Sequence, residues 1–204
     1  VRDYAFPIPL AMICELIGVP LEDAPRIESW SRQVLESVDE GRVLTPELEQ
    51  CRNQAMLGFC GYFQSLIERR RASPRDDLIS RLLDVQRGAE DLADEDIVAT
   101  AILLFQAGHD TTAGLISKGM LALLQHPDEL AKLRARPELL PNATEELLRF
   151  DTSVQLSVNF ATADVAYHDR TIRDGDAVII LRGAANRDPE RFPEPDRLDI
   201  ERDD

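Results

Sequence analysis

LLFQAGHDTTAG, residues 103–114, lies inside a long apolar segment and yet contains a glycine, an aspartate and two adjacent threonines. The surrounding segment begins with three acidic residues at Asp94 and stops at His126, just before a proline. These boundaries predict one helix roughly 50 Å long, at 1.5 Å per residue. Residues spaced three and four apart lie on the same face of a helix. One face of this helix is therefore predicted to carry Ile97, Ala101, Leu104, Gly108, Thr111 and Leu115, with Leu103 and Ala107 beside it.

Gly108 and the threonines weaken this helix locally. A glycine in a helix interior costs about 1 kcal/mol relative to alanine, and threonine hydroxyls there tend to bond the carbonyl one turn back. Ala107 and Gly108 would leave a flat groove for a large planar partner, with a carboxylate and a hydroxyl on the next turn. The alternative is a close helix crossing at Gly108, with Thr111 and Thr112 bonded to the backbone and Asp110 paired to a distant arginine.

The composition sets the class of protein. The chain has 204 residues, of which 44% are hydrophobic, and a formal net charge of −15 without a basic cluster. It can form one sizeable core or two small ones, and its charge argues against binding nucleic acid or an anionic membrane. We find no apolar run of membrane-spanning length, no CxxC pair and no zinc-ligand spacing, so we expect a reduced, cytoplasmic chain without a metal site of its own.

The remaining segments predict a mainly α fold with a small late β-sheet. Helices are expected over Pro7–Ile17 and Leu21–Val38, from an N-cap at Thr45 to the arginines at 69–71, and over Asp76–Gln86, Pro127–Arg136 and Asn142–Phe150. Two β-type runs, Val165–Ile172 and Ala177–Leu181, are joined through Asp174-Gly175, which predicts a hairpin. We expect one partial domain, helical over 1–150 with a β-hairpin region over 151–204, cut from a longer protein.

Several motifs together resemble the soluble bacterial members of the cytochrome P-450 family. Residues 107–112, AGHDTT, resemble the oxygen-activation motif of the family's long distal helix, and Glu146-Leu147-Leu148-Arg149 resembles its E-x-x-R motif. Residues 183–204, GAANRDPERFPEPDRLDIERDD, are similar to the family's meander, and residues 4–20 to a segment near the middle of its chain. The resemblance implies the cytochrome P-450 fold in partial form, without its N-terminal part.

The resemblance also implies a reaction. A haem-thiolate monooxygenase inserts one oxygen atom from O2 into a small organic substrate, with haem b and electrons from NAD(P)H through a ferredoxin and ferredoxin reductase or an equivalent donor. Asp110 would relay protons and Thr111 would supply a hydrogen bond where oxygen is activated. The implied haem contacts are Leu103, Leu104, Ala107, Gly108 and Thr111.

The family's positions further imply a substrate pocket at Leu103, Gln106, Ala107 and Val154. Gln106 is the one polar residue among them, so we expect an apolar substrate that carries a polar group. His109 is expected to be a surface or packing residue.

Spacing alone makes Glu146 and Arg149 an ion pair on one helix face, which could be an ordinary surface pair. The resemblance implies instead a buried triad completed by Arg197 of the meander.

Two departures from the family matter. The axial cysteine is expected in a Gly-rich loop shortly after Asp204, and Cys14, Cys51 and Cys60 lack that context, so we expect this chain alone to be inactive. Asn159 stands where bacterial members commonly carry an arginine for a haem propionate. The alternatives are therefore a haemless homologue that activates a partner protein such as a glycosyltransferase, or an inert fragment.

Overall fold

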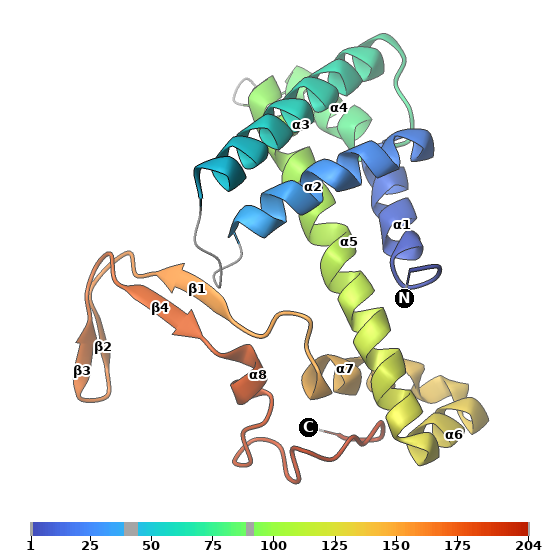
Figure 1. Cartoon of the computed structure of the whole chain (residues 1–204), viewed down its shortest axis with the longest axis vertical. Helices are drawn as coiled ribbons and strands as arrows, with labels where there is room; N and C mark the ends of the chain where they lie inside the picture. Colours follow the sequence, from blue (N-terminus) through green and yellow to red (C-terminus); the bar gives the residue numbers. More distant parts are fainter. Residues whose placement is uncertain (1, 39–44, 89–91, 204) are drawn as a thin grey trace. The chain divides into compact units, whose positions relative to one another are not determined.

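The structure is a computed structural model that describes residues 2–38, 45–88 and 92–203. Its residues form two compact units, one up to Ala113 and the other from Gly114 onward. The division falls within the long helix α5 (Asp94–Gln125), drawn in yellow-green in Figure 1. The prediction of a single helix from Asp94 to His126 is confirmed to within one residue.

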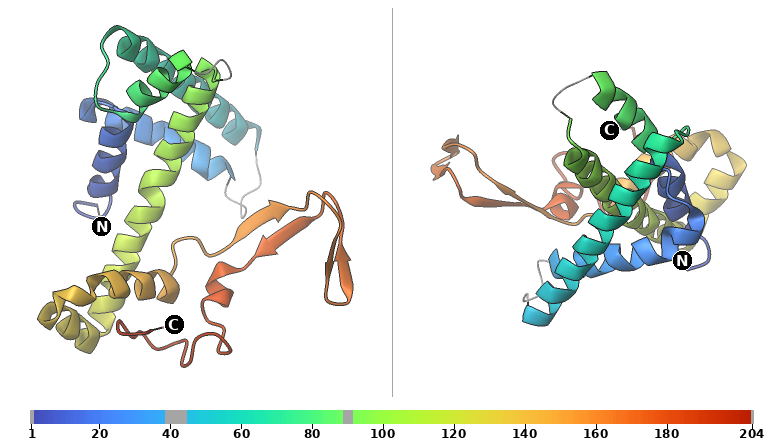
Figure 2. Two further views of the ribbon diagram at one scale, coloured as in Figure 1. Left: turned by 180° about the vertical axis from the view of Figure 1, so that it is seen from behind. Right: turned by 90° about the horizontal axis from the view of Figure 1, so that it is seen from above.

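The first unit consists of helices. Its part before α5 contains α1 (Pro7–Ile17), the short 3-10 helix η1 (Leu21–Asp23), α2 (Ala24–Val38), α3 (Pro46–Ala72) and α4 (Leu78–Gly88). Helix α3 packs against both α2 and α4, as the views of Figure 2 show. The predicted helix over Leu21–Val38 is therefore split into a 3-10 turn and an α-helix.

Helix α1 begins and ends as its sequence predicts. Pro7 occupies the first helical turn, and Gly18 follows the last turn with φ 98° and donates its N–H to the Cys14 carbonyl at 2.9 Å. Left-handed backbone of this kind is strained for residues with a Cβ. A Cβ on Gly18 would also lie 2.2 Å from Asp77 Oδ2, so glycine is required there on two counts.

Side-chain caps set where α3 and α4 begin. Thr45 Oγ1 accepts from the Leu48 N–H at 3.3 Å, which confirms the predicted N-cap. Asp77 Oδ1 accepts from the Ser80 N–H at 2.8 Å in the same way. Helix α4 therefore begins at Leu78 and not at the predicted Asp76, because Asp77 acts as a cap outside the helix.

Aromatic side chains fill the core of the first unit. Phe59 stacks on Phe63 with ring centroids 6.2 Å apart and meets Phe105 of α5 at 6.1 Å. All three rings are fully buried. The aliphatic residues around them include Ile17, Ile27, Leu66, Ile67, Ile79 and Ile97. These contacts join α1, α2, α3 and α4 to the first half of α5.

A buried ion pair ties three of these helices together. Arg70 Nε donates to Asp77 Oδ2 at 2.5 Å, and another Arg70 nitrogen donates to the Gly18 carbonyl at 2.5 Å. Burial raises the pKa of Asp77, but the hydrogen bonds from Ser80 and Arg70 outweigh it, and the net effect is a pKa below the ordinary value. The end of α1, the last turns of α3 and the start of α4 therefore meet at one charged junction.

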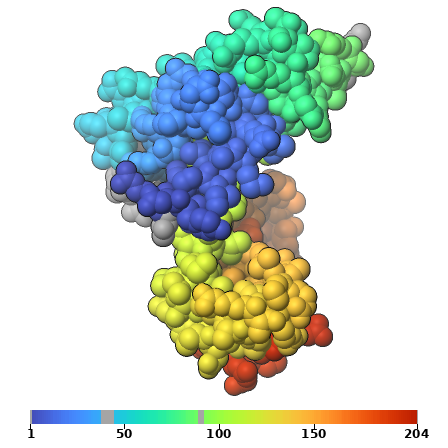
Figure 3. All heavy atoms as spheres, turned by 90° about the vertical axis from the view of Figure 1, so that its right-hand side faces the viewer, coloured from blue at the N-terminus to red at the C-terminus, as the bar shows by residue number. Residues whose placement is uncertain are grey.

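The second unit begins with the rest of α5 and continues through α6 (Pro127–Ala135), the 3-10 helix η2 (Pro137–Leu139) and α7 (Leu140–Phe150). Four short strands follow, β1 (Ser157–Phe160), β2 (Val165–Tyr167), β3 (Arg170–Ile172) and β4 (Ala177–Ile180), and then the single turn α8 (Arg182–Ala185). Its small core contains Ala122, Leu123, Ala143, Leu198 and Ile200. In Figure 3 the end of α5 and helices α6 and α7, in yellow to orange, form one closely packed mass.

The strands do not pair as the sequence predicts. The run Val165–Ile172 is not one strand but folds back on itself, because His168 adopts φ 52° and turns β2 onto β3. Strand β4 pairs instead with β1, which the sequence analysis did not identify, with Ser157 opposite Ile180. Asp174-Gly175 is a turn, but it connects β3 to β4 without pairing them. The predicted turn at Asp174-Gly175 is therefore present, but the predicted strands and their pairing as a hairpin are wrong.

The irregular segment after α8 returns to α7. Asn142 Nδ2 donates to the carbonyls of Ile200 at 2.8 Å and Arg202 at 3.0 Å. In the part of the chain that the structure describes, no helix is both long and apolar enough to cross a membrane.

Candidate functional site

The candidate site of the first unit is an exposed line on α5. Leu103, Ala107 and Thr111, four residues apart, are all exposed, and Leu103 retains 65% of its accessible surface. We call these three residues the α5 stripe. The Thr111 hydroxyl donates to the Ala107 carbonyl at 3.0 Å, and the Thr112 hydroxyl donates to the Gly108 carbonyl at 3.3 Å. The expected bonding of threonines to the preceding turn is therefore present.

Leu104 and Gly108 lie beside this stripe, on the side of the core, so they do not share one face with Thr111 as the sequence predicts; their role as haem contacts stays a prediction. Leu104 packs against the core of the first unit, and a Cβ on Gly108 would lie 2.7 Å from Ile13 Cδ1 of α1. Each follows a stripe residue by one position, and one position rotates a side chain by about 100° around the helix. Gly108 therefore allows the close approach of α1, which is the packing role that the sequence left as an alternative.

Asp110 lies beside the stripe with its side chain 41% exposed. One carboxylate oxygen, Oδ1, lies 3.5 Å from His109 Nε2. In the described chain Asp110 has no ion pair with an arginine, so the predicted alternative of a distant arginine partner is not what the structure shows. A carboxylate and a hydroxyl thus stand on neighbouring positions of one helix turn, next to an uncharged surface.

Gln106 and Leu103 line a groove in the first unit. This groove has a volume of about 360 Å³ and is mostly apolar, with Met56 and Cys60 of α3 on its other side. Gln106 Nε2 is buried and has no hydrogen-bond partner among the residues described. Two of the four predicted substrate-pocket residues are therefore in one groove. Ala107 is on the stripe, and Val154 is exposed in the second unit, after α7.

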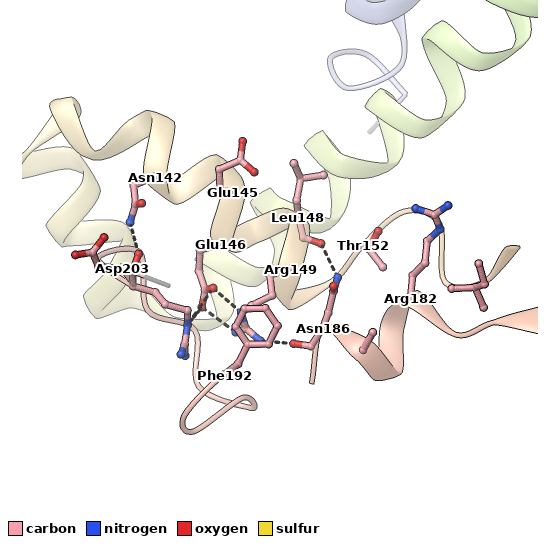
Figure 4. Close-up of a pocket in the computed structure, with 13 residues that line it drawn as sticks. Asn142, Glu145, Glu146, Leu148, Arg149, Thr152, Arg182, Asn186, Phe192 and Asp203 are labelled. Carbon is pink, nitrogen blue, oxygen red and sulfur yellow. Dashed lines mark hydrogen bonds and ion pairs between the residues drawn. The ribbon is translucent and has the colours of Figure 1, made fainter. Parts of the chain in front are cut away.

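The second unit contains a separate feature, a buried charge network on α7 (Figure 4). Glu146 and Arg149 form a two-pronged pair, with Nε to Oε2 at 2.6 Å and Nη2 to Oε1 at 2.9 Å. Both side chains are less than a tenth exposed, so this is not a surface pair. Arg149 Nη1 also donates to the carbonyls of Asn186 at 2.8 Å and Pro195 at 2.9 Å.

The third member of this network is Arg202 and not the predicted Arg197. Arg202 Nε lies 3.2 Å from Glu146 Oε2, and its side chain is 11% exposed. The Arg197 side chain is 58% exposed and pairs with Glu194 and Asp199, while only its carbonyl accepts, from Arg149 at 3.3 Å. We call Glu146, Arg149 and Arg202 the Glu146 network.

A signal in the sequence could have identified Arg202. Leu198 and Ile200 are buried while their neighbours are more exposed, so side chains of this segment alternate as in an extended chain. Arg202 is in phase with the two buried residues, whereas Arg197 is out of phase. The apolar residues next to the arginines therefore distinguish the inward from the outward one.

The network lines a pocket of about 580 Å³ in the second unit, together with Asn142, Arg182, Asn186 and Phe192. Figure 4 shows Phe192 drawn beside the Arg149 side chain, and the guanidinium carbon lies 5.3 Å from the ring centroid. Asn159 is exposed on β1, opposite Val178 of β4.

The three cysteines differ in accessibility. Cys14 is buried, and burial raises the pKa of its thiol to about 11, so it remains a neutral thiol near neutral pH. Cys51 is exposed on α3 and Cys60 is partly buried there. Within residues 2–38, 45–88 and 92–203, no group of three histidine, cysteine or acidic side chains is arranged to hold a metal ion.

Comparison with known proteins places these features in a family. The model of the family "Cytochrome P450" matches residues 42–202. A vitamin D(3) 25-hydroxylase of Pseudonocardia autotrophica is 45% identical over 99% of this chain and 48% of its own length. The biotin biosynthesis cytochrome P450 of Bacillus subtilis is 41% identical over 99% of this chain and 50% of its own.

A solved structure has the same fold. P450BioI, in a complex with an acyl carrier protein that carries hexadec-9Z-enoic acid, superposes with a TM-score of 0.91 at 39% identity, over 99% of this chain and 51% of its own. The mostly helical fold predicted from the sequence, in partial form, is thereby confirmed. The chain spans about half the length of the curated relatives it matches.

Proposed function

Because this chain belongs to the cytochrome P450 family, we propose that the full-length protein is a haem-thiolate monooxygenase, which inserts one atom of O2 into a small organic substrate. The observation that carries this proposal is the arrangement on α5. An uncharged exposed stripe ends in a threonine whose hydroxyl is held by Ala107, and the carboxylate of Asp110 stands on the preceding position.

The α5 stripe fits one face of a haem. Leu103, Ala107 and Thr111 carry no charge, and Ala107 is small enough to leave a flat surface between the other two. When bound, haem b supplies the iron at which O2 is activated. Its thiolate would come from a cysteine of the full-length protein outside these 204 residues, since buried Cys14 is a neutral thiol and neither Cys51 nor Cys60 lies on the stripe.

Asp110 and Thr111 have different roles in proton transfer, Asp110 as the proton donor and Thr111 as a hydrogen-bond acceptor. The Thr111 hydroxyl uses its hydrogen on the Ala107 carbonyl, so its oxygen is free to accept a hydrogen bond on the exposed side. Asp110 is half exposed, and it can take a proton from solvent and pass it toward that hydroxyl. The chain thus provides a proton donor and a fixed acceptor next to the stripe.

The groove beside the stripe favours an apolar substrate with an acceptor group. Leu103, Met56 and Cys60 provide apolar contact, while Gln106 Nε2 is a buried donor without a partner. A carbonyl or hydroxyl oxygen on the substrate would satisfy it. The names of the relatives agree in chemistry, since both vitamin D(3) and hexadec-9Z-enoic acid are largely hydrocarbon with few oxygen atoms.

Electrons are proposed to come from NAD(P)H through a ferredoxin and its reductase or an equivalent donor. This part of the proposal rests on membership of the family alone.

The carbon monoxide difference spectrum of the reduced full-length protein tests the proposal. A thiolate-ligated haem gives a Soret band strongly displaced to longer wavelength, and this displaced band is the expected result. A protein that takes up no haem would contradict the proposal and favour the haemless activator. Turnover with NAD(P)H, ferredoxin and ferredoxin reductase on a panel of sterols and fatty acids would then identify the substrate class.

A further inference from the structure

Lys118, in the part of α5 that belongs to the second unit, makes contacts that the proposed chemistry does not use. Its Nζ donates to Asp151 Oδ1 at 2.9 Å and to the Thr152 carbonyl at 3.1 Å. Both acceptors follow α7 directly, in the short segment that leads to β1 (Figure 1). We call residues 151–155 the Val154 loop. An ammonium group donates up to three hydrogen bonds, so one lysine binds a side chain and the backbone of this loop together.

Gly114 lets the same loop approach α5 closely. It lies four residues before Lys118 and therefore on the same face of the helix. A Cβ on Gly114 would lie 2.8 Å from Ser153 Oγ and 3.2 Å from Ser153 Cβ, so the loop occupies the space that glycine leaves free. Three consecutive loop residues, 151–153, thus contact this face of α5.

Gln155 binds the same two oxygen atoms as Lys118, from the far end of the loop. Its Nε2 donates to the Thr152 carbonyl at 2.8 Å and to Asp151 Oδ1 at 3.3 Å. Its own carbonyl accepts from the Gly183 N–H of α8 at 3.0 Å. The loop is therefore held to α5 at one end and to α8 at the other.

Val154 is the loop residue whose side chain these contacts leave accessible. Its N–H donates to Thr152 Oγ1 at 3.3 Å, while the residue keeps 39% of its accessible surface. The residues on both sides of Val154 are held by hydrogen bonds, so its backbone is fixed although its isopropyl group is free. An apolar side chain supported in this way by polar contacts is suited to contact an apolar ligand.

An ordinary surface ion pair does not account for Lys118. The side chains of Lys118 and Asp151 are 34% and 41% exposed, and a pair of this kind contributes little to stability. Ion pairing would also leave the Thr152 carbonyl without a reason to lie 3.1 Å from Nζ. The contacts of Lys118 therefore determine the position of the loop more than they stabilise the protein.

We propose that Lys118 is a positioning residue for Val154: it fixes the Val154 loop against α5, so that Val154 keeps one place at the substrate. This inference rests on the proposed function, because it takes Val154 as one of the residues that contact the substrate of that reaction. Lys118 does not contact the substrate itself. It affects how well a ligand fits and not the proton transfer assigned to Asp110.

Two azole probes of different size test this in the full-length haem protein. Imidazole and phenylimidazole bind to haem iron through the same nitrogen, but only the phenyl ring extends toward the surrounding side chains. Lys118→Met should raise the dissociation constant of phenylimidazole by about fourfold, as loss of one buried methylene contact does, and leave that of imidazole unchanged. Optical titration of the haem measures both. Equal changes for the two probes, or none, would overturn the proposal.

Lys132→Met is the matched control. Lys132 also belongs to the second unit and is 28% exposed, and its Nζ lies 3.0 Å from Glu129 Oε1 and 3.0 Å from Glu201 Oε2, neither of them in the Val154 loop. Its loss should lower the free energy of unfolding about as much as Lys118→Met and leave the affinity for phenylimidazole unchanged. If Lys132→Met weakened phenylimidazole equally, Lys118 would act through general stability and the proposal would be wrong.

A double-mutant cycle shows whether Lys118 acts through Val154. Val154→Ala should itself weaken phenylimidazole, and Lys118→Met should then cause little further loss. Two losses that multiply would mean that Lys118 affects the probe by another route, which contradicts the proposal.

A further readout does not depend on ligand binding. In carbon-13 spectra of the full-length ferrous carbon monoxide form, Lys118→Met should shift the methyl resonances of Val154 and leave those of Val178 on β4 unchanged. Lys132→Met should leave both valines unchanged. Val154 resonances that stay in place in Lys118→Met would contradict the positioning role.

The two proposals fail in different ways. A wrong proposed function shows as a wild-type protein without the displaced Soret band. A wrong inference shows in a protein that has this band, as unchanged Val154 resonances and unchanged azole affinities in Lys118→Met.

Discussion

Thr111 is the residue at which the proposed reaction depends on a single hydroxyl. We expect Thr111→Ala to retain haem binding but to release more peroxide per NAD(P)H, since the hydrogen-bonding oxygen beside Asp110 is lost. Stability should not fall, because Thr111 is exposed and alanine is favoured in a helix by roughly 0.5 kcal/mol. Peroxide and NAD(P)H measured together check this. Thr111→Ser, which keeps the hydroxyl, is the control, and unchanged coupling in the alanine variant would refute the assignment.

Gln106 should determine how well oxygen-bearing substrates bind. Its buried Nε2 has no partner in the described chain, so a substrate acceptor would gain one hydrogen bond there. Gln106→Leu should raise the dissociation constant of such a substrate by up to about tenfold and should strengthen binding of a pure hydrocarbon of the same size. Titration of the haem spectrum with matched alcohol and alkane ligands measures both. Equal effects on the two ligands would mean that Gln106 makes no such bond.

At the residue scale, the sequence predicted which types of residue form the site but not every position. Motifs predict Asp110, Thr111, Glu146 and Arg149; the structure leaves the first two accessible on α5 and pairs the last two in the interior. Arg202 was missed because a motif match gives the order of residues along the chain and not the direction in which each side chain points.

The C-terminal segment is held to α7 by the Glu146 network, which makes a prediction about elements. Arg202→Met should destabilise the protein by about 3 kcal/mol, because Glu146 remains buried with one charge partner fewer. Arg197→Met is the matched control and should cost less than about 1 kcal/mol, since its ion pairs are exposed. Denaturant unfolding of the full-length protein compares them. Equal losses of unfolding free energy in the two variants would mean that Arg197 belongs to the Glu146 network as much as Arg202 does.

The junction of α1, α3 and α4 should be sensitive to acid. The pKa of Asp77 is lower in the folded protein than in the unfolded chain, because hydrogen bonds from Ser80 and Arg70 outweigh the effect of burial. Its stabilisation is therefore complete above the ordinary aspartate pKa of about 3.9 and is lost as the pH falls through the lower folded value.

Asp77→Asn should accordingly cost about 3 kcal/mol at neutral pH, by leaving Arg70 buried without its counter-charge. The difference from wild type should shrink below the ordinary aspartate pKa. Arg71→Met, which breaks the exposed pair with Asp94, is the control and should have a much smaller effect. Unfolding free energies measured across acid pH decide this, and a difference that did not change with pH would contradict the assigned direction.

At the element scale, long helices were predictable and short strands were not. Caps and periodic apolar residues gave α1, α3 and α5 to within one or two residues. Strands of three or four residues carry too few alternating positions to reveal their partners. The pairing of β1 with β4 joins positions about twenty residues apart, and local turn residues do not encode it.

At the scale of the whole molecule, the chain alone should not form a haem-thiolate site. Cys14 is a buried neutral thiol, and the other two cysteines lie on α3 and not on the α5 stripe, with Cys60 in the groove beside Leu103. We expect the isolated chain, supplied with haem, to lack the displaced Soret band that the full-length protein shows. Carbon monoxide difference spectra of both proteins test this, and a displaced band from the isolated chain would identify one of its own cysteines as the ligand.

The isolated chain should also associate with itself. Many large apolar side chains are exposed, including Leu103, Met120, Leu121, Leu124 and Leu181. Exposed apolar surface of this kind marks places where other protein or a ligand binds. Sequence composition could not show this, because an ordinary hydrophobic content of 44% does not reveal which side chains remain uncovered. The division into two compact units, which falls within α5, could not be predicted either, because the apolar periodicity of this helix continues across it.

The positive φ of Gly18 means that the chirality of a residue placed at this position decides whether the fold accepts it. An L-residue there would have an unfavourable φ and a methyl group directed into Asp77. A D-residue prefers positive φ and places its side chain on the opposite side of the backbone, away from that carboxylate. D-alanine introduced by chemical ligation should therefore be accepted where L-alanine is not, and it should stabilise the protein by removing freedom from the unfolded chain. A D-residue fits this one position better than an L-residue because the backbone of Gly18 has a positive φ, which D-residues favour.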